Sequence, residues 1–183
     1  MSERYKHKLS ESEFFFDHMI ESQNNRVHFR YYLSAFLSAS RSVLQYADAE
    51  TNLGKNPNAR PEAQKWYLDV VKKSPRVSYF KDARDLNIHT SPISPRAHIS
   101  VMFKEEIGVG ESVTVSINGE KQPTIPKEHE VEVVRKEFPP EVSYKYVFDN
   151  WPESEDVIQI CRKYLDELAS IVKEGIAKGF ISG

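Results

Sequence analysis

Apolar residues recur at steps of three and four through the first half of the chain, the spacing of amphipathic helices. Ser10 and Glu13 have the spacing of a capping box, which predicts a first helix over about 11–22 behind a frayed tail at 1–9. A break at Gln23–Asn25 separates it from the strongest stripe. That stripe predicts the central helix of the fold, through Phe29, Tyr32, Leu33, Phe36, Leu37, Ser40, Val43 and Leu44.

Three more helices follow from similar signals. Pro61 suits the first turn of a third helix, and Ser74-Pro75 restarts a shorter fourth one that the pattern carries to about Leu86. The clearest stripe closes the chain, where Ser154 is the expected cap and Gly179 the expected end. Its apolar positions are Val157, Ile160, Cys161, Tyr164, Leu165, Leu168, Ile171, Val172 and Ile176.

Between the helical stretches apolar and polar residues alternate, as they do in half-buried strands. Gly108 and Gly110 fall in the expected connection between the first two strands, and Asn118-Gly119 is a strong turn signal. The simplest assembly is a four-stranded antiparallel meander over about 97–149. Its inward positions are Ile99, Val101 and Phe103, then Val113, Val115 and Ile117, then Val131 and Val133, and finally Val142, Tyr144, Tyr146 and Phe148.

These elements predict an α+β fold that is mainly α. We expect a single domain over 1–183, in which an antiparallel helical bundle, 10–90 and 153–179, receives the antiparallel β-meander before its last helix. The chain has 183 residues, of which 39% are hydrophobic and 28% charged, values typical of a globular domain. The sequence leaves open whether the β-insertion at 97–149 packs on the helical bundle or stands apart from it.

Charge and composition narrow the classes of function. The net charge of −2 gives no global basic field of the kind that marks a general nucleic-acid binder. A single cysteine, Cys161, excludes an intrachain disulfide and fits a reducing compartment. The polar segment Met1–Ser12 lacks the apolar core of a secretory signal, and no stretch is long enough to cross a bilayer. We expect a cytoplasmic protein with no membrane, no cofactor and, since its six histidines are scattered, no metal.

One segment near the end of the fourth expected helix carries side chains suited to RNA chemistry. Arg84 is an always-charged fork that matches phosphate oxygens, and His89 can take or give a proton near neutral pH. Cleavage of RNA without a metal needs both functions, a base for the 2′-OH and a cation for the pentacoordinate phosphate. At a frayed helix end, Arg84 and His89 could both reach one phosphate.

This segment resembles the signature of the HEPN superfamily, in which an Arg, a polar residue and a later His follow one another as Arg84, Asp85 and His89 do here. Members are small helical bundles, often dimeric, and many are ribonucleases of toxin–antitoxin and phage-defence systems. The resemblance, which covers about 10–90 and 153–179, implies a homodimer with Arg84 and His89 as catalytic residues at the dimer cleft, and a protein antitoxin as partner. Many active members carry Tyr two residues after the His, where this chain has Ser91.

Positive charge also gathers around the motif. The segment from Lys65 to His98 holds seven Lys and Arg residues against three Asp, a plausible phosphate footprint in an acidic protein. Tyr67 or Tyr79 could stack on a base if exposed. Four residues near the motif are candidates for nucleic-acid binding, namely Arg76, Lys81, Asp85 and Asn87.

Other interpretations remain open. Arg84 could simply pair with Asp82 or Asp85, while His89 bonds the last carbonyls of the helix. RNA contact without catalysis is a second interpretation. A third is a non-catalytic dimeric scaffold or protein-interaction module, whose recognition surface is the β-meander. It predicts that Arg84 and His89 are bonded into the structure and that exposed apolar residues gather on the sheet.

Overall fold

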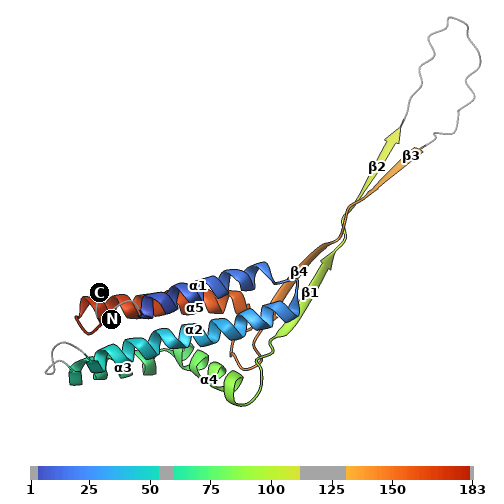
Figure 1. Ribbon diagram of the computed structural model, residues 1–183. Helices are drawn as coiled ribbons and strands as arrows, with labels where there is room; N and C mark the ends of the chain where they lie inside the picture. The colour runs from blue at the N-terminus through green and yellow to red at the C-terminus, as the bar shows by residue number, and fades with distance from the viewer. Residues whose placement is uncertain (1–3, 54–59, 112–130, 182–183) are drawn as a thin grey trace, which may run out of the picture. The chain divides into compact units, whose positions relative to one another are not determined.

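The structure is a computed structural model, and it describes residues 4–53, 60–111 and 131–181. The described part is α+β and mainly helical, which confirms the fold class (Figure 1). In chain order its elements are α1 (Arg4–Glu21), α2 (Arg26–Leu53), α3 (Arg60–Lys73), α4 (Pro75–His89), β1 (Arg96–Met102), β2 (Glu105–Glu111), β3 (Val131–Glu137), β4 (Glu141–Val147) and α5 (Val157–Ala177).

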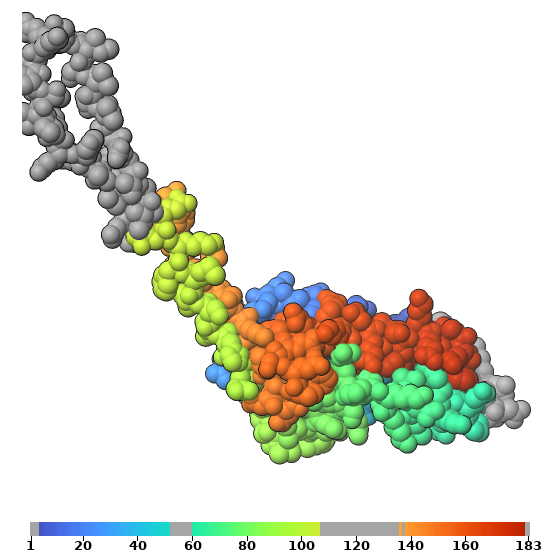
Figure 2. All heavy atoms as spheres, turned by 180° about the vertical axis from the view of Figure 1, so that it is seen from behind, coloured from blue at the N-terminus to red at the C-terminus, as the bar shows by residue number. Residues whose placement is uncertain are grey.

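Helix α2 is the central element of the helical part, as its long apolar stripe predicts. It contacts each of the other four helices, and Figure 1 shows it running beside α1 and α5. Phe36 lies at the centre of the core, with its ring 6.2 Å from Phe16, 6.1 Å from Phe80 and 6.4 Å from Tyr164. Aromatic side chains from four helices therefore meet at one residue of α2, which fixes how the bundle closes. On the opposite face of the molecule, α5 runs beside α3 and α4 (Figure 2).

Helix α1 begins earlier than the sequence predicts. The expected frayed tail at 1–9 is wrong, since α1 starts at Arg4 and Ser10 lies inside it rather than at its cap. The reason is tertiary: Tyr5 is buried to 1% exposure in a small cluster with residues of α2 and the C-terminal segment, namely Val43, Ala47, Val172 and Ile181. One isolated aromatic in a charged segment gives no periodic signal, so the pattern could not show this packing.

Helix ends agree with the sequence in part. Ser74 caps α4 as expected, since its Oγ accepts from the Val77 N–H at 3.0 Å. The cap of α5 is Asp156 rather than Ser154, with Oδ1 accepting from the Ile158 N–H at 2.7 Å. Gly179 closes α5 with a φ of 71°, a left-handed conformation that glycine adopts without strain.

The strands pair differently from the expected four-stranded meander, which is wrong for the described part of the chain. There β1 pairs with β4 and β2 pairs antiparallel with β3, so two two-stranded sheets form. The segment expected as a connection is itself β2, in which Gly108 lies opposite Val134 and Gly110 opposite Glu132. Alternation identifies a strand but not its neighbour, because pairing is a property of two segments. The strand expected at 113–117 and the turn at Asn118-Gly119 lie outside the described residues.

The chain divides into two compact units, one formed by 1–99 with 144–183 and the other by 100–143. In the first unit the end of β4 packs on the helices. Tyr146 is buried, its ring stacks on Phe29 at 3.7 Å, and its hydroxyl donates to the carbonyl oxygen of Gln23 at 2.8 Å. This contact secures β4 to the turn between α1 and α2, just before the chain enters α5.

Candidate functional site

Helix α4, which carries the Arg84–His89 motif, packs on the bundle through a narrow buried face. Val77, Phe80 and Ala83 form that face, and the Phe80 ring stacks on Tyr164 of α5 with centroids 4.2 Å apart. The helix stays regular through His89, three residues beyond the predicted end. The motif therefore lies on a formed helix, and helix geometry decides where its side chains point.

Arg84 is directed toward the bundle rather than toward open solvent. Its side chain is 24% exposed, and Nη1 donates to Oδ1 of Asp85 at 3.0 Å. Its Nε is buried and, within the described residues, has no hydrogen-bond partner. This is the charge pair between Arg84 and Asp85 that the sequence offers as an alternative to an RNA site. It occupies one of the terminal nitrogens of the guanidinium group.

Asn87 has a structural role. Its Nδ2 donates to Oγ of Ser34 in α2 at 2.8 Å, while its Oδ1 accepts from the Ile93 N–H at 2.9 Å. The side chain thus connects the end of α4 to α2 and to the segment that leads into β1. These two hydrogen bonds fix the orientation of the amide and use one of its two N–H donors and one of its two oxygen lone pairs.

His89 points in a different direction from Arg84. It is the last residue of α4 and is exposed, and no hydrogen bond or ion pair holds its imidazole within the part of the chain that the structure describes. Because successive side chains of a helix are about 100° apart, five positions separate Arg84 from His89 by about 140°. The two side chains therefore leave α4 in different directions, and a second copy of the chain offers another way to bring an Arg84 and a His89 together.

The positive footprint around the motif is smaller than the sequence indicates. Three of its seven cations have acidic partners: Arg84 pairs with Asp85, Arg76 with Glu167 at 2.9 Å, and Arg96 with Asp149. The exposed cations that remain are Lys65, Lys72, Lys73 and Lys81. Glu167 and Asp149 lie more than fifty residues along the chain from their partners, so a local charge count could not include them.

A groove of about 620 Å³ lies beside the motif, between α4 and the segments that flank β1 and β4. Neither Arg84 nor His89 lines it; its charged residues are the acids Asp82 and Asp149. Tyr79 forms part of the wall and packs against Phe80, Phe148 and Trp151, while Tyr67 is only 8% exposed. Tyr67 is therefore too buried to stack on a base, whereas Tyr79 is half-buried among three aromatic neighbours; the acidic lining does not favour a phosphate.

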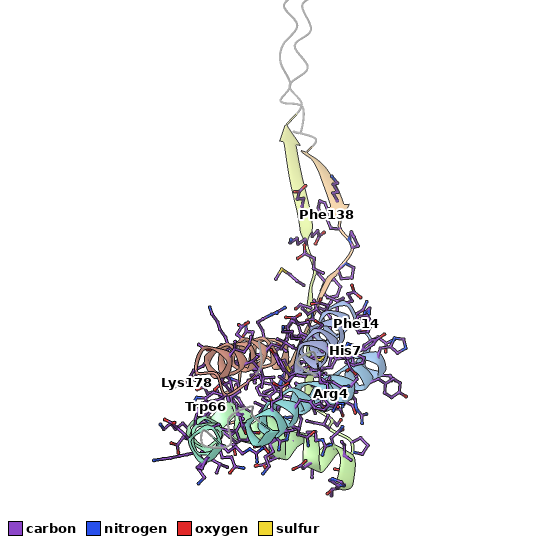
Figure 3. The ribbon with its side chains drawn as sticks, turned by 60° about the vertical axis from the view of Figure 1, so that its left-hand side comes forward. Arg4, His7, Phe14, Trp66, Phe138 and Lys178 are labelled. Atoms are coloured by element: carbon purple, nitrogen blue, oxygen red, sulfur yellow. The ribbon has the colours of Figure 1, made fainter. Side chains whose placement is uncertain are left out.

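A second groove, of about 530 Å³, lies between α3 and α5. Trp66 forms one wall, and its Nε1 donates to Oε1 of Glu174 at 2.8 Å, while Lys178 lies 3.5 Å from the same carboxylate (Figure 3). Three lysines and three acids line it in balance, namely Lys65, Lys73, Lys178, Glu62, Asp69 and Glu174. This groove is not electropositive and offers no alternative phosphate site.

Exposed apolar residues occur on the helices as well, but a group of them lies in and beside the strands. Among described residues, Phe103 is 78% exposed, Met102 58%, Val101 48% and Val142 46%. All four lie in the unit 100–143, and we call them the ribbon surface. Ile99, two residues before Val101 on β1, is also exposed; since side chains of a strand alternate between its faces, Ile99 and Val101 share one face and Met102 lies on the other. Alternation at 99–103 predicts a strand, but only the structure shows that its apolar side chains are uncovered.

The single cysteine lies in the core rather than in a groove. Cys161 is fully buried in the core, and burial raises the pKa of its thiol well above the usual value, so it remains a neutral thiol as its place on the apolar stripe indicates. Among the described residues, no three His, Cys, Asp or Glu side chains come together as a metal site requires. None of the described helices combines the length and apolar character needed to cross a bilayer.

Comparison with protein-family models, with curated proteins and with solved structures finds no match to this chain. The functional argument therefore depends on the residues and their geometry. Of the six predicted site residues, four are hydrogen-bonded to other side chains, namely Arg76, Arg84, Asp85 and Asn87, while Lys81 and His89 are exposed.

Proposed function

We propose that this protein is a protein-interaction module whose recognition element is the two-stranded sheet of β1 and β4. The observation that carries the proposal is the ribbon surface: four apolar side chains from 46% to 78% exposed, three of them at 101–103, at the end of β1 and just after it, and the fourth, Val142, on β4. Isolated exposed apolar residues are ordinary, but a group of them on one short sheet marks a contact surface.

The sheet itself supports the same proposal. Within the described part of the chain, β1 has one neighbour, β4, and β4 has one neighbour, β1. Each strand therefore presents a free edge of backbone N–H and C=O groups, and a two-stranded sheet is marginally stable by itself in water. A third strand supplied by a partner would satisfy one edge and cover the apolar side chains at the same time.

The chemistry of the surface defines the partner class. Lys104 and Glu141, which lie beside the ribbon surface, form an ion pair with their Nζ and Oε1 atoms 2.5 Å apart. The pair has no net charge, so it does not favour a partner of either sign. Recognition then depends on main-chain hydrogen bonds and on apolar side chains. The partner we infer is a protein that offers an extended segment with β-branched or aromatic residues at alternate positions.

Peptides selected for binding to the intact chain test this proposal. Peptides from a random displayed library are expected to be extended and apolar, and Val101→Ser/Phe103→Ser should weaken their binding at least about tenfold, because the substituted side chains supply the buried area. Binding would be measured by fluorescence anisotropy. Leu68→Ser, which changes a 52% exposed residue on α3, is the matched control and should bind as the parent does. Equal binding by the ribbon variant would reject the proposal.

A metal-independent endoribonuclease of toxin or defence type, or an RNA-binding protein, is the second candidate. The observation that favours it is the free, exposed imidazole of His89 at the end of α4, with Lys81 exposed on the same helix. The HEPN resemblance supports the same assignment, with Arg84 and His89 brought together at a dimer cleft. Arg76, Asp85 and Asn87 would then act by holding α4 in place rather than by touching RNA.

Incubation with total RNA in EDTA tests the second candidate. If it holds, the parent cleaves RNA and His89→Ala lowers the rate by about 10²–10⁴-fold, the usual contribution of a positioned acid–base group. His98→Ala, at an exposed histidine on β1, is the matched control and should cleave normally. A folded parent that leaves RNA intact, or a His89→Ala variant as fast as the parent, would exclude it.

A further inference from the structure

We propose that the exposed face of α1 is a self-complementary interface, on which a second copy of this chain packs its own α1 in antiparallel orientation about Phe14. The proposal is independent of the ribbon surface, because it concerns the unit formed by 1–99 with 144–183. It follows from where one aromatic residue lies and from the order of charges around it.

Phe14 lies on the side of α1 that faces away from the core. The buried residues of the helix are Tyr5, Ser12, Phe16 and Met19, all within about 40° of the direction opposite Phe14 on a regular helix. The Phe14 side chain is 55% exposed, close to the middle of the helix. It rests edge-on against His18 at 4.3 Å, and His18 in turn stacks on Tyr32 of α2 at 5.1 Å. A large apolar ring is thus held outward in a defined position.

The residues in line with Phe14 have the spacing of a helix-packing seam. His7, Glu11, Phe14, His18 and Glu21 follow one another at steps of four, three, four and three, the repeat by which one helix packs along another. Each of the five is exposed or half-buried, and Figure 3 shows His7 and Phe14 on α1. Since four of the five are polar, the seam fits a specific partner rather than the apolar core of its own chain.

Read in the reverse direction, the seam matches itself. In an antiparallel pair centred on Phe14, His7 lies opposite Glu21 of the second copy, Glu11 opposite His18, and Phe14 opposite Phe14. Every layer then joins a histidine to a carboxylate or a ring to a ring, as a two-fold symmetric interface requires. A parallel pair would instead place Glu11 on Glu11 and Glu21 on Glu21, which like charge disfavours.

The other charges of α1 also suit an antiparallel pair, because cations lie toward the N-terminus of the helix and acids toward its C-terminus. Residues 4–10 include three Lys and Arg and no acid, whereas residues 11–25 include four acids and no Lys or Arg. This order opposes the helix dipole, which favours acids at the N-terminus and cations at the C-terminus, so helix stability does not explain it. Within the chain some of these groups are already paired, as Lys8 with Glu11, His18 with Glu21 at 2.9 Å, and Asp17 with Arg162 at 4.0 Å. Glu21 nevertheless stays 69% exposed and can accept a second donor.

Charge exchange along the seam provides the decisive experiment. One variant, His7→Glu/His18→Glu, places acids opposite acids in its own dimer; the other, Glu11→Lys/Glu21→Lys, places cations opposite histidines and loses both carboxylates. Each alone is expected to be monomeric by sedimentation velocity. An equimolar mixture should recover the dimer, because every layer of the mixed pair joins opposite charges or a histidine to a carboxylate.

Removal of the central ring is the second measurement. Phe14→Ala should raise the dissociation constant of the parent dimer at least about tenfold, while Leu68→Ala, at a similarly exposed residue of α3, should leave it unchanged. Far-ultraviolet circular dichroism verifies that each variant is folded. A parent that stays monomeric at every concentration tested, a dimer that tolerates Phe14→Ala, or folded exchange variants that fail to combine would each overturn the proposal.

Discussion

Replacing Phe80 with alanine is expected to lower the free energy of unfolding by about 3–5 kcal/mol, the range for a large aromatic removed from a packed core. The side chain is 1% exposed and stacks on Tyr164, with Phe36 and Phe148 at its edges. It is the largest of the three buried residues through which α4 packs on the bundle. The cavity left by alanine would therefore loosen the helix that carries Arg84 and His89.

Urea denaturation followed by circular dichroism measures this effect. Leu86→Ala is the control on the same helix; at 43% exposure its loss should cost no more than about 0.5 kcal/mol. If Phe80→Ala and Leu86→Ala were equally stable, the described packing of α4 would be wrong.

Asp156 is the second residue at which a large effect is expected. One carboxylate oxygen accepts from the Ile158 N–H at 2.7 Å and caps α5, while the other accepts from the Tyr146 N–H at 3.2 Å. The same charge lies at the positive end of the α5 dipole. Asp156→Ala loses a cap and leaves a partly buried strand N–H unpaired, for an expected cost of about 2–3 kcal/mol.

Substitution by asparagine separates the contributions at this site. Asp156→Asn keeps one acceptor oxygen but loses the charge and the second acceptor, and should cost about half as much as alanine. Asp166→Ala, at an exposed acid in the middle of α5, is the matched control and should change stability little. The unfolding midpoint in urea measures all three. An Asp156→Ala variant as stable as Asp166→Ala would show that the carboxylate does not join α5 to β4.

The candidate RNA site shows how far local sequence can predict function. The sequence identifies the helix and the residue types of the motif, and the pairing of Arg84 with Asp85 was one of its interpretations. It could not show that Asn87 bonds Ser34, because that partner is 53 residues away. Nor could it show the direction of His89, which depends on α4 remaining helical for three residues more than predicted.

The exposed aromatics illustrate the same limit from the opposite side. Phe103 follows an alternating pattern typical of a half-buried strand, yet its side chain is 78% exposed. Phe14 lies next to two other phenylalanines, and the sequence indicates that not all three can face the core. Only the packing of α1 decides that Phe16 is the buried one and Phe14 the exposed one.

The sequence by itself determined the elements whose signals are local and repeated. The stripes of α2 and α5, the restart at Ser74-Pro75 and the glycine that closes α5 are each determined by a few neighbouring residues, so periodicity and turn chemistry suffice to predict them. Even the mainly helical α+β class follows from the change of period between the two halves of the chain.

Tertiary structure alone decided the features that depend on distant partners. The start of α1 depends on the cluster around Tyr5. The cap of α5 depends on a carboxylate that also accepts a hydrogen bond from β4. The sheet of β1 and β4 forms between strands that are about forty residues apart in sequence. The charge around α4 depends on Glu167 and Asp149. In each case the deciding interaction forms between segments far apart in sequence, and its free energy is gained only when the whole bundle packs.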